Sequence, residues 1–342
     1  VSLDNGKSWS DYSGMRLKIY PQDVYESDTN IALGMDLSLL LAYLDAGTIY
    51  SDSAGNVVAN PLVWFRSMGV NYVRCRLFVD PSASTVGADY QCQIQQDLNY
   101  VKRFGKIVKD AGYRFLLDIH YSDEWADPAK QYLPSSWQSI SSQTELQDSV
   151  YAYTKHVLTT LVDYGAEPDM VQVGNEISYG MFYKSTSNPS YKVNALIGYS
   201  GTYNTDARWQ NFTDVLKNGI RACREVCPQA KVMLHIERTG QSDKCVMFFN
   251  KMNSYNVDYD VIGLSYYPIW HNTLSVLDAT LTTLEQNFAD KKIMLAEYGY
   301  YYQYFPSSYQ YSAKEIGYAA TKTGQAAFVS DLIAVLRGHS SV

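Results

Sequence analysis

Several features are missing from the sequence, and each absence excludes a class of protein. Only five of the 342 residues are cysteine, and none forms a Cys-x-x-Cys pair or stands beside histidines at metal-ligand spacing. No apolar stretch is long enough to cross a membrane. The net charge is −7, and lysine and arginine do not cluster in a block anywhere along the sequence. We therefore expect no metal or other cofactor, no transmembrane segment and no nucleic-acid partner.

Two of the cysteines, Cys223 and Cys227, lie four residues apart on a predicted helix. A disulfide at that spacing would be strained, so we expect both to serve as small apolar residues. The odd number of cysteines leaves the redox compartment open.

Aromatic residues, by contrast, are abundant: the chain has 31 tyrosines and 6 tryptophans. Rings of this kind stack on sugar faces and hydrogen-bond to hydroxyl groups, although a tyrosine-rich surface without a ligand would have the same composition. With 46% hydrophobic residues the chain can bury a large core, which favours one large domain and, as the simplest state, a monomer.

Short apolar runs alternate with helix-length segments along the chain, which is the order of a βα repeat. The runs predict seven strands, at Ile31–Leu39, Tyr72–Val79, Arg114–Tyr121, Met170–Glu176, Lys231–Glu237, Val261–Tyr267 and Lys292–Tyr298. Amphipathic segments between them predict helices, including Asp97–Asp110, Glu145–Tyr164, Trp209–Val226 and Leu274–Phe288. Near-continuous apolar strands joined by helices favour a parallel sheet, so we predict an α/β fold of the (β/α)8 TIM-barrel type.

The two ends of the chain do not fit this repeat. After Glu297 the sequence predicts a loop and a helix at Gln325–Arg337, but no eighth strand. An open barrel would expose two sheet edges, so we expect residues beyond Val342 to close it. Residues 1–30 are interpreted as an N-terminal extension or the remnant of an upstream module, with one strand at Met15–Tyr20, and residues 31–342 as the catalytic barrel. Because the chain starts at Val1 without methionine, we expect a processed start.

Two glutamates stand at the carboxyl ends of apolar runs: Glu176 ends Met170–Glu176, and Glu297 ends the run from Ile293. A carboxyl group where a buried strand meets a loop is partly desolvated, which raises its pKa and lets it act as an acid near neutral pH. Two such groups across one cleft can cleave a glycosidic bond. We therefore predict a retaining glycosidase with Glu176 as acid/base and Glu297 as nucleophile.

Glu237 also ends a predicted strand and is the reserve candidate. It could bind a sugar hydroxyl instead, and a salt bridge with Arg238 is an equal alternative. Asn175, directly before Glu176, provides an amide that could hydrogen-bond a sugar 2-hydroxyl in the transition state.

Arg74 and Arg76 lie two residues apart on a predicted strand, so their side chains point to the same side. A buried arginine needs an anion, and a catalytic carboxylate is one candidate. Pairing with an acid in the lower barrel is the other, which we expect for at most one of the two.

The loop after the third predicted strand combines donors, acceptors and an indole in the segment Asp118–Pro128. Its composition is typical of a sugar subsite, with His120, Asp123 and Trp125 as candidate contacts. A metal site in this loop is disfavoured because no recognised ligand spacing is present.

These motifs together resemble those of family 53 glycoside hydrolases, which are endo-β-1,4-galactanases. The resemblance rests on Arg-x-Arg on the second strand, Asp-x-His-x-Ser-Asp-x-Trp-Ala-Asp-Pro after the third, Val-Gly-Asn-Glu-Ile on the fourth, Ser-Tyr-Tyr-Pro on the sixth and Glu on the seventh. It extends from about Ile31 to Arg337. It implies a retaining (β/α)8 enzyme that attacks internal β-1,4-galactosyl linkages in the galactan side chains of pectin.

The resemblance also implies roles for individual residues. Glu176 matches the family's acid/base and Glu297 its nucleophile. The expected lining of the subsite for the cleaved sugar, with its neighbours, is Asp36, Arg74, His120, Trp125, Asn175, His235, Tyr266 and Tyr267.

This chain departs from the family pattern in two places. The Trp-Glu-Pro segment of the eighth strand is absent, and the loop after Glu297 is rich in tyrosine without a carboxylate cluster, so we predict no calcium site there. Those tyrosines could widen the substrate groove or pack against a missing strand.

Three alternatives follow from the same residues. A β-mannanase or a β-glucanase would share the two glutamates. A non-catalytic galactan-binding protein would be consistent with a barrel that lacks its eighth strand. Two closely placed carboxylates argue against the binding protein. Because plant-wall polysaccharide lies outside cells, we expect an exported protein that is extracellular or at the cell surface.

Overall fold

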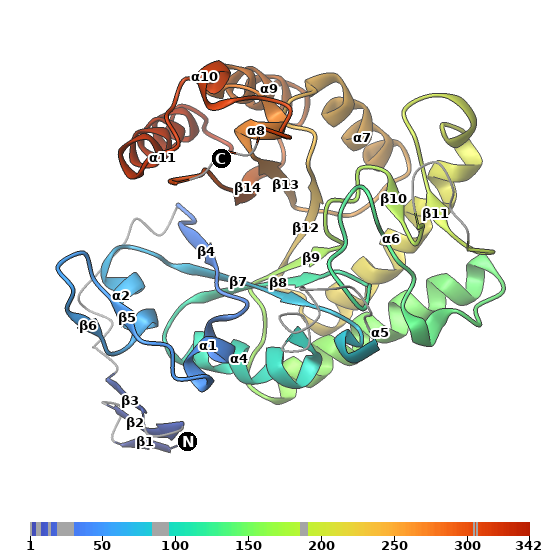
Figure 1. Cartoon of the computed structure of the whole chain (residues 1–342). Coiled ribbons are helices and arrows are strands. Elements are labelled where there is room, and N and C mark those ends of the chain that lie inside the picture. The colour runs from blue at the N-terminus through green and yellow to red at the C-terminus, as the bar shows by residue number, and fades with distance from the viewer. Residues whose placement is uncertain are drawn as a thin grey trace. The chain divides into compact units, whose positions relative to one another are not determined.

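The computed structural model describes residues 2–4, 8–12, 15–18, 31–83, 96–184, 191–303, 305 and 307–342. The chain forms two compact units (Figure 1). The first comprises Val1–Trp125, Ala152–Val171 and Ala222–Ala230, and the second comprises Ala126–Tyr151, Gln172–Arg221 and Lys231–Val342. Each unit has its own parallel strands and covering helices.

In the first unit three parallel strands are paired in chain order: β4 (Gly34–Asp36), β7 (Tyr72–Leu77) and β8 (Arg114–Ile119). All of β7 and all but the first residue of β8 are buried, as expected for strands covered on both faces. Helix α4 (Leu98–Asp110) packs against β7 and β8 and is capped by the Asp97 carboxylate, which accepts from the backbone N–H of Tyr100. Shorter elements complete the unit: α1 (Leu40–Asp45), β5 (Tyr50–Ser51), β6 (Val57–Val58), α2 (Pro61–Ser67) and η2 (Pro81–Ala83).

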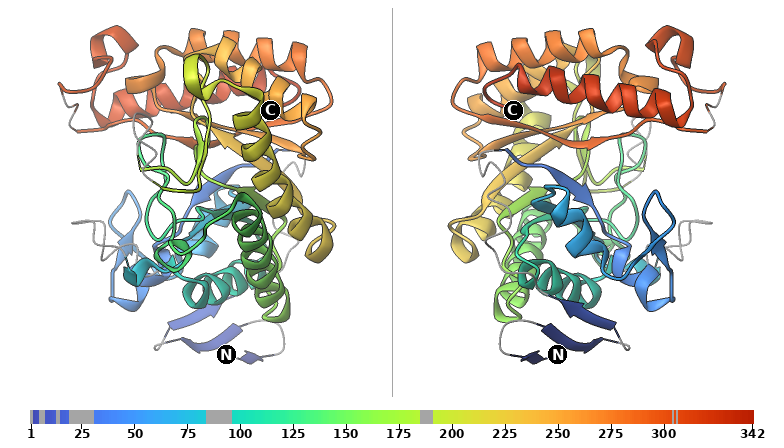
Figure 2. Two further views of the ribbon diagram at one scale, coloured as in Figure 1. Left: turned by 90° about the vertical axis from the view of Figure 1, so that its right-hand side faces the viewer. Right: turned by 90° about the vertical axis from the view of Figure 1, so that its left-hand side faces the viewer.

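The second unit repeats this plan with β12 (Lys231–Ile236), β13 (Val261–Tyr266) and β14 (Lys292–Tyr298), again parallel and paired in chain order. Helix α9 (Leu274–Asn287) contacts both α7 (Ser242–Ser254) and α11 (Lys322–Arg337), and Figure 2 shows α11 running alongside α9. The remaining elements are η4 (Ser135–Trp137), β10 (Gly180–Met181), β11 (Ala195–Leu196), η5 (Gly201–Tyr203), α8 (Pro268–His271) and α10 (Ala313–Ile316).

Three elements run from one unit into the other: α5 (Gln143–Asp163), β9 (Met170–Val173) and α6 (Asp206–Val226). All four residues of β9 are buried.

The predicted strands and helices are present, with differences at their ends. The seven predicted strands correspond to β4, β7, β8, β9, β12, β13 and β14, and the predicted helices to α4, α5, α6, α9 and α11. The first and fourth strands are shorter than predicted: only Gly34–Asp36 is extended at the start of the barrel sequence, and β9 stops at Val173. In the described part of the chain, no further strand follows β14.

The N-terminal segment is more regular than predicted. In place of one strand it contains three, β1 (Ser2–Asp4), β2 (Ser8–Tyr12) and β3 (Met15–Lys18), paired as an antiparallel sheet. Tyr20, the predicted end of the strand, lies outside the described residues.

The pairing of β13 with β14 contains a one-residue irregularity that decides where Glu297 points. Leu264 pairs with Leu295, but the next residue, Ser265, pairs with Glu297, so Ala296 is skipped as a β-bulge. Paired residues of parallel strands point to the same face of a sheet. The bulge therefore places Glu297 on the face of Ser265, whereas a regular register would place it on the opposite face.

The described cysteines Cys75, Cys223, Cys227 and Cys245 are buried and free, which confirms that Cys223 and Cys227 act as small apolar residues. Cys92 lies outside the described residues. Among the described helices, none combines the length and the apolar character needed to cross a bilayer.

Candidate active site

Glu176 stands on a sharp turn at the end of β9. Gly174 has φ 86° and Glu176 has φ 50°, both in the left-handed region that non-glycine residues rarely adopt. The next residue is anchored, because the backbone N–H of Ile177 donates to the carbonyl of His235 at 3.0 Å. A strained backbone of this kind is typical of functional positions, where surrounding contacts hold a side chain in place.

The carboxyl group of Glu176 has neighbours that favour its protonated form. Burial raises its pKa well above the usual value, and the carboxylates of Glu297 and Glu237 raise it further. The hydroxyl of Ser265 acts in the opposite direction, since it donates to Oε1 of Glu176 at 2.6 Å. Glu176 is therefore suited to hold a proton near neutral pH, which is the requirement for a general acid.

Glu297 is partly exposed near the end of β14 and has a different environment. The phenol of Tyr267 donates to its Oε2 at 2.9 Å. A hydrogen bond to a carboxylate fixes the orientation of the group. Two carboxyl groups that influence each other but differ in surroundings are the expected signature of an acid and a nucleophile.

Glu237, at the end of β12, forms the salt bridge that the sequence offered as one alternative. Its Oε1 lies 2.8 Å from Nη2 of Arg238 and accepts from the Ser178 hydroxyl at 2.5 Å. Burial raises the pKa of Glu237 even though Arg238 and Ser178 act in the opposite direction. The second oxygen, Oε2, is buried and has no hydrogen-bond partner among the residues that the structure describes, which leaves an acceptor available for a ligand hydroxyl.

Behind Glu176 lies a buried set of polar side chains from β9, β12 and β13. Nε2 of His235 lies 2.8 Å from Oγ of Ser265, and Nδ1 lies 2.9 Å from Oδ1 of Asn175 and 3.0 Å from Nε2 of Gln172. His235, Asn175 and Ser265 have no exposed surface. They therefore support Glu176 from within the unit.

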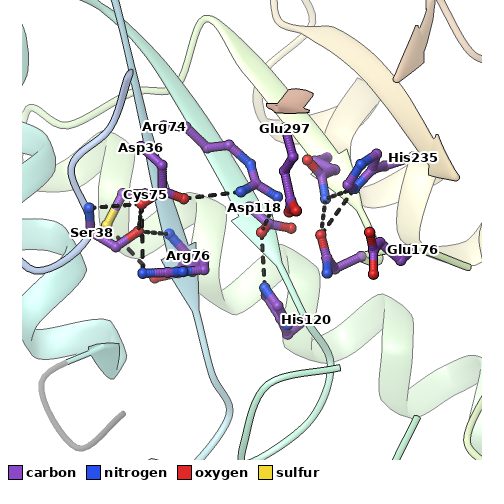
Figure 3. A network of polar contacts seen from close by, with 12 residues as sticks. Asp36, Ser38, Arg74, Cys75, Arg76, Asp118, His120, Glu176, His235 and Glu297 are labelled. Atoms are coloured by element: carbon purple, nitrogen blue, oxygen red, sulfur yellow. Dashed lines mark hydrogen bonds and ion pairs between the residues drawn. The ribbon is translucent and has the colours of Figure 1, made fainter. Parts of the chain in front are cut away.

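A second polar cluster lies in the first unit, at the carboxyl ends of its strands (Figure 3). Arg74 forms ion pairs with Asp36 at 2.9 Å and with Asp118 at 2.7 Å. Nε2 of His120 lies 2.9 Å from the same Asp118 oxygen that Arg74 contacts. Asp118 and His120 are buried, whereas Asp36 retains 28% of its side-chain exposure.

Arg76 extends this cluster toward Trp125. Its guanidinium lies 4.1 Å from the centre of the Trp125 ring and 3.6 Å from Asp36, and its Nε donates to Gln96 at 2.9 Å. Both arginines thus pair with a carboxylate of their own unit. Stacking on an indole and salt-bridge pairing together explain why two adjacent inward-facing arginines are tolerated.

Three predicted sugar contacts are buried in the structure. Tyr266 is fully buried on the face of β13 opposite Ser265, where its ring lies against Phe328 of α11 and its hydroxyl donates to the Asn272 carbonyl at 2.8 Å. His235 and Asn175 are buried and hydrogen-bonded to protein groups, with Nδ2 of Asn175 donating to the Ala126 carbonyl at 2.8 Å. For these three residues a contact with sugar stays a prediction from the sequence.

Three predicted residues lie at strand ends, where the sequence placed them: Tyr267 follows β13, Glu237 follows β12 and Glu297 lies near the end of β14. In the first unit, Trp125 is partly exposed, and the buried Asp123 accepts from the backbone N–H of Asp80 at 3.0 Å. Among the residues that the structure describes, no group of three or more His, Cys, Asp or Glu side chains could hold a metal ion.

Ser265, Ser178 and Gln172 contact the site but were missed by the sequence reasoning. The sequence did contain a signal for Ser265. Side chains alternate along a strand, so Ser265 points to the same face as Tyr267, and Tyr266 points to the opposite face. Nothing in the sequence indicated Ser178 or Gln172, which are common residues without a motif.

Comparisons with known proteins show what this chain is similar to. The family model described as glycosyl hydrolase family 53 matches residues 32–340. An uncharacterized protein from the bgaB 5′ region of Niallia circulans is 38% identical over 269 residues, with 78% of this chain and 67% of that protein covered. An endo-beta-1,4-galactanase of Bacillus subtilis is 31% identical over 269 residues, with 79% and 56% covered.

A solved structure, the GH53 catalytic domain of Ignisphaera aggregans, superposes with a TM-score of 0.76 at 31% identity and covers 94% of this chain and 84% of that one. The predicted (β/α)8 barrel class is thereby confirmed. The chain spans between about half and about two thirds of the length of the two relatives compared above.

Proposed function

The chain belongs to glycosyl hydrolase family 53, and on this basis we propose that it is an endo-β-1,4-galactanase. Its substrate is then the β-1,4-galactan of (arabino)galactan side chains in pectin. The observation that carries the proposal is the pairing of a buried, proton-holding Glu176 with the carboxyl group of Glu297 in one unit. The name of the Bacillus subtilis relative supports the choice of linkage.

We propose a retaining, double-displacement mechanism. Glu176 donates its proton to the glycosidic oxygen as that bond breaks, while a carboxylate oxygen of Glu297 attacks the anomeric carbon and forms a covalent glycosyl ester. In the second step Glu176, now ionised, removes a proton from water, whose oxygen displaces Glu297 and leaves the product with its original configuration. The hydrogen bond from Tyr267 holds Glu297 in its attacking orientation.

Further contacts with substrate are proposed for residues that have capacity left for a ligand. Oε2 of Glu237 is a buried acceptor without a partner, and it would accept a sugar hydroxyl. For Asp36, Arg74, His120, Asp123 and Trp125 the contact with sugar remains a prediction from the sequence. We also propose that the protein acts outside the cell, as a monomer, on a polysaccharide that cannot enter it.

The test compares wild type with E176A and E297A on linear β-1,4-galactan, with galactomannan and β-glucan as control polymers. Short galacto-oligosaccharides from galactan alone, lost in both variants, would support the proposal. Cleavage of a control polymer in preference to galactan would make the protein a different barrel glycosidase. Binding to galactan without cleavage of any polymer would make it a binding protein.

The two roles are separated by adding azide with an activated aryl β-1,4-galactobioside. If Glu176 is the acid/base, E176A still forms the covalent ester from this substrate, and azide then yields the β-galactobiosyl azide. If Glu297 is the nucleophile, E297A yields the α-azide, because azide attacks the substrate directly from the side that Glu297 occupied. The reverse pairing of products and variants would exchange the roles.

A further inference from the structure

The hydroxyl of Ser265 connects Glu176 to a histidine that no proposed step of the reaction uses. Oγ of Ser265 lies 2.6 Å from Oε1 of Glu176 and 2.8 Å from Nε2 of His235. Both Ser265 and His235 have no exposed surface, so water does not compete for these hydrogen bonds. The three side chains come from three successive strands of the barrel order, after β9, on β12 and on β13.

We propose that Ser265 and His235 are positioning residues for the acid/base: a buried hydrogen-bond chain holds Oε1 of Glu176 and leaves Oε2 as the oxygen that exchanges a proton with the glycosidic bond. This inference rests on the proposed function and identifies which groups tune the acid/base of that same site.

A count of hydrogens shows what the chain requires. A serine hydroxyl carries one hydrogen, so Ser265 can donate to only one of its two neighbours. When Glu176 is ionised it can only accept, so Ser265 donates to Oε1 and receives a hydrogen bond from Nε2–H of His235. When Glu176 carries its proton on Oε2, Oε1 still only accepts and this arrangement is unchanged. When the proton rests on Oε1, that oxygen can donate to Ser265 instead, whose hydroxyl then donates to an unprotonated Nε2.

The other ring nitrogen of His235 has a partner in both arrangements. Nδ1 faces an acceptor, Oδ1 of Asn175 at 2.9 Å, and a donor, Nε2 of Gln172 at 3.0 Å. The orientation of each amide is fixed, because Nδ2 of Asn175 donates to the Ala126 carbonyl and Nε2 of Gln172 donates to the Gly174 carbonyl. The chain is therefore complete whether or not Glu176 carries its proton, and an acid/base must pass through both states.

The electrostatic setting explains why such a chain is needed. The groups that face Glu176 are mostly negative: Glu297 on β14, Glu237 after β12 and Asp127 in the loop after β8 all raise its pKa, as does burial. Arg238 is already engaged by Glu237 and Ser178. Ser265 is the group that favours the ionised form, without which Glu176 would be a poor base in the second step.

The sharpest test is a direct titration of Glu176 that does not depend on activity. Protein labelled with ¹³C at the glutamate side-chain carboxyl carbon is titrated by NMR, and the Glu176 signal is assigned by its absence in E176Q. In S265A the titration midpoint should rise by about one pH unit, since a hydrogen bond to the charged form is lost. In H235Q the rise should be smaller, and in S265A/H235Q it should equal that of S265A alone, because His235 acts only through Ser265.

Two controls separate this role from general damage. T239V removes a buried hydroxyl that donates to the Ser265 carbonyl at 2.7 Å without reaching Glu176, so it should leave the midpoint unchanged. S265T restores a hydroxyl and should return the midpoint toward that of wild type. An unchanged Glu176 midpoint in S265A, or additive shifts in the double variant, would overturn the inference.

Kinetics then distinguish this inference from the proposed function. If wild type cleaves galactan, the alkaline limb of its kcat/KM profile should move upward in S265A by the same amount as the NMR midpoint. Activity in wild type with no NMR shift would overturn the inference alone. A shift in NMR with no hydrolysis by wild type would overturn the proposed function and leave the hydrogen-bond chain established.

Discussion

Moving the carboxylate of Glu297 by one residue, in the variant A296E/E297A, should abolish catalysis. The pairing of β14 with β13 places residue 297 opposite Ser265 and skips residue 296 as a bulge. A carboxylate at residue 296 therefore loses the place opposite Ser265, and because side chains alternate along a strand it also loses the direction in which Glu297 meets Tyr267. Deletion of Ala296 has the opposite consequence, since it removes the skipped residue and leaves Glu297 opposite Ser265 in a regular register.

The size of the effect follows from strand geometry. One residue advances a strand by about 3.3 Å and reverses the direction of its side chain. Since an error of about 1 Å in a reacting group can cost about 100-fold in rate, loss of the correct face should cost at least about 10⁴-fold, or about 5.5 kcal/mol of transition-state stabilisation. A296E/E297A should therefore be about as inactive as E297A, whereas the variant that lacks Ala296 should retain activity.

The assay is reducing-sugar release from β-1,4-galactan, with urea unfolding and near-ultraviolet circular dichroism to confirm a folded protein. The matched control is A296S, which keeps the residue count and the bulge and should stay within about tenfold of wild-type activity. The variant that lacks Ala296 keeps Glu297 opposite Ser265 and should be more active than A296E/E297A. A folded A296E/E297A variant with more than about a tenth of wild-type activity would refute the argument.

Three further predictions concern stability. In E176Q the free energy of unfolding should exceed that of wild type near pH 7 but not near pH 4. The folded state binds the Glu176 proton more tightly than the unfolded chain does, so the contribution of Glu176 to wild-type stability falls as pH rises above about 4.3. Urea unfolding that gave the same difference between the two proteins at pH 4 and at pH 7 would contradict this. In G180A the new Cβ would lie 2.0 Å from the Ala195 carbonyl oxygen at a φ of 87°, so a loss of at least about 2 kcal/mol is expected by urea unfolding, and a loss below about 0.5 kcal/mol would be inconsistent with the β10–β11 pairing. Burial lowers the pKa of His339, but its hydrogen bonds to Glu285 and Asp278 outweigh burial and raise the pKa overall. H339Q should therefore be less stable than wild type at pH 6, by about 1 kcal/mol or less, and should melt at a lower temperature. This difference in melting temperature should vanish as pH rises above the folded-state pKa of His339, whereas a constant difference would exclude the ion pairs.

The strands could be predicted because buried strands consist mainly of apolar residues. Runs such as 72–77 and 261–266 are buried at every residue, so they appear in the sequence as mainly apolar stretches rather than as strict alternation, even though the first contains Arg74 and Arg76 and the second Ser265. The ends were less predictable. Glu176 was assigned to a strand that stops at Val173, because the left-handed backbone of Gly174 and Glu176 leaves no trace in a pattern of apolar residues.

Elements of six or seven residues, such as α1 and α2, were not predicted at all, since two turns carry too little periodicity to stand out from a loop. Side-chain pairing was equally hidden. The sequence showed that Arg74 and Arg76 share a face, but the choice of Asp36 and Asp118 as their partners depends on which strands are neighbours. The register between two strands depends on segments that are far apart in the sequence, whereas burial can be read from the composition of a single segment.

The proposed catalytic residues lie where the structure departs from ordinary folding rules. Glu176 has a left-handed backbone, three acidic neighbours and a buried carboxyl group, Glu297 owes its direction to a bulge, and Glu237 keeps an unpaired buried oxygen. Each of these features costs stability on its own, by about 1 to 3 kcal/mol for backbone strain or an unsatisfied polar atom. All three belong to the second unit and lie at or near the carboxyl ends of β9, β12 and β14, where the local cost is offset by the buried apolar strands beneath them. A sequence selected for stability alone would retain none of them, so their concentration in one place is itself an argument that this end of the second unit performs the chemistry.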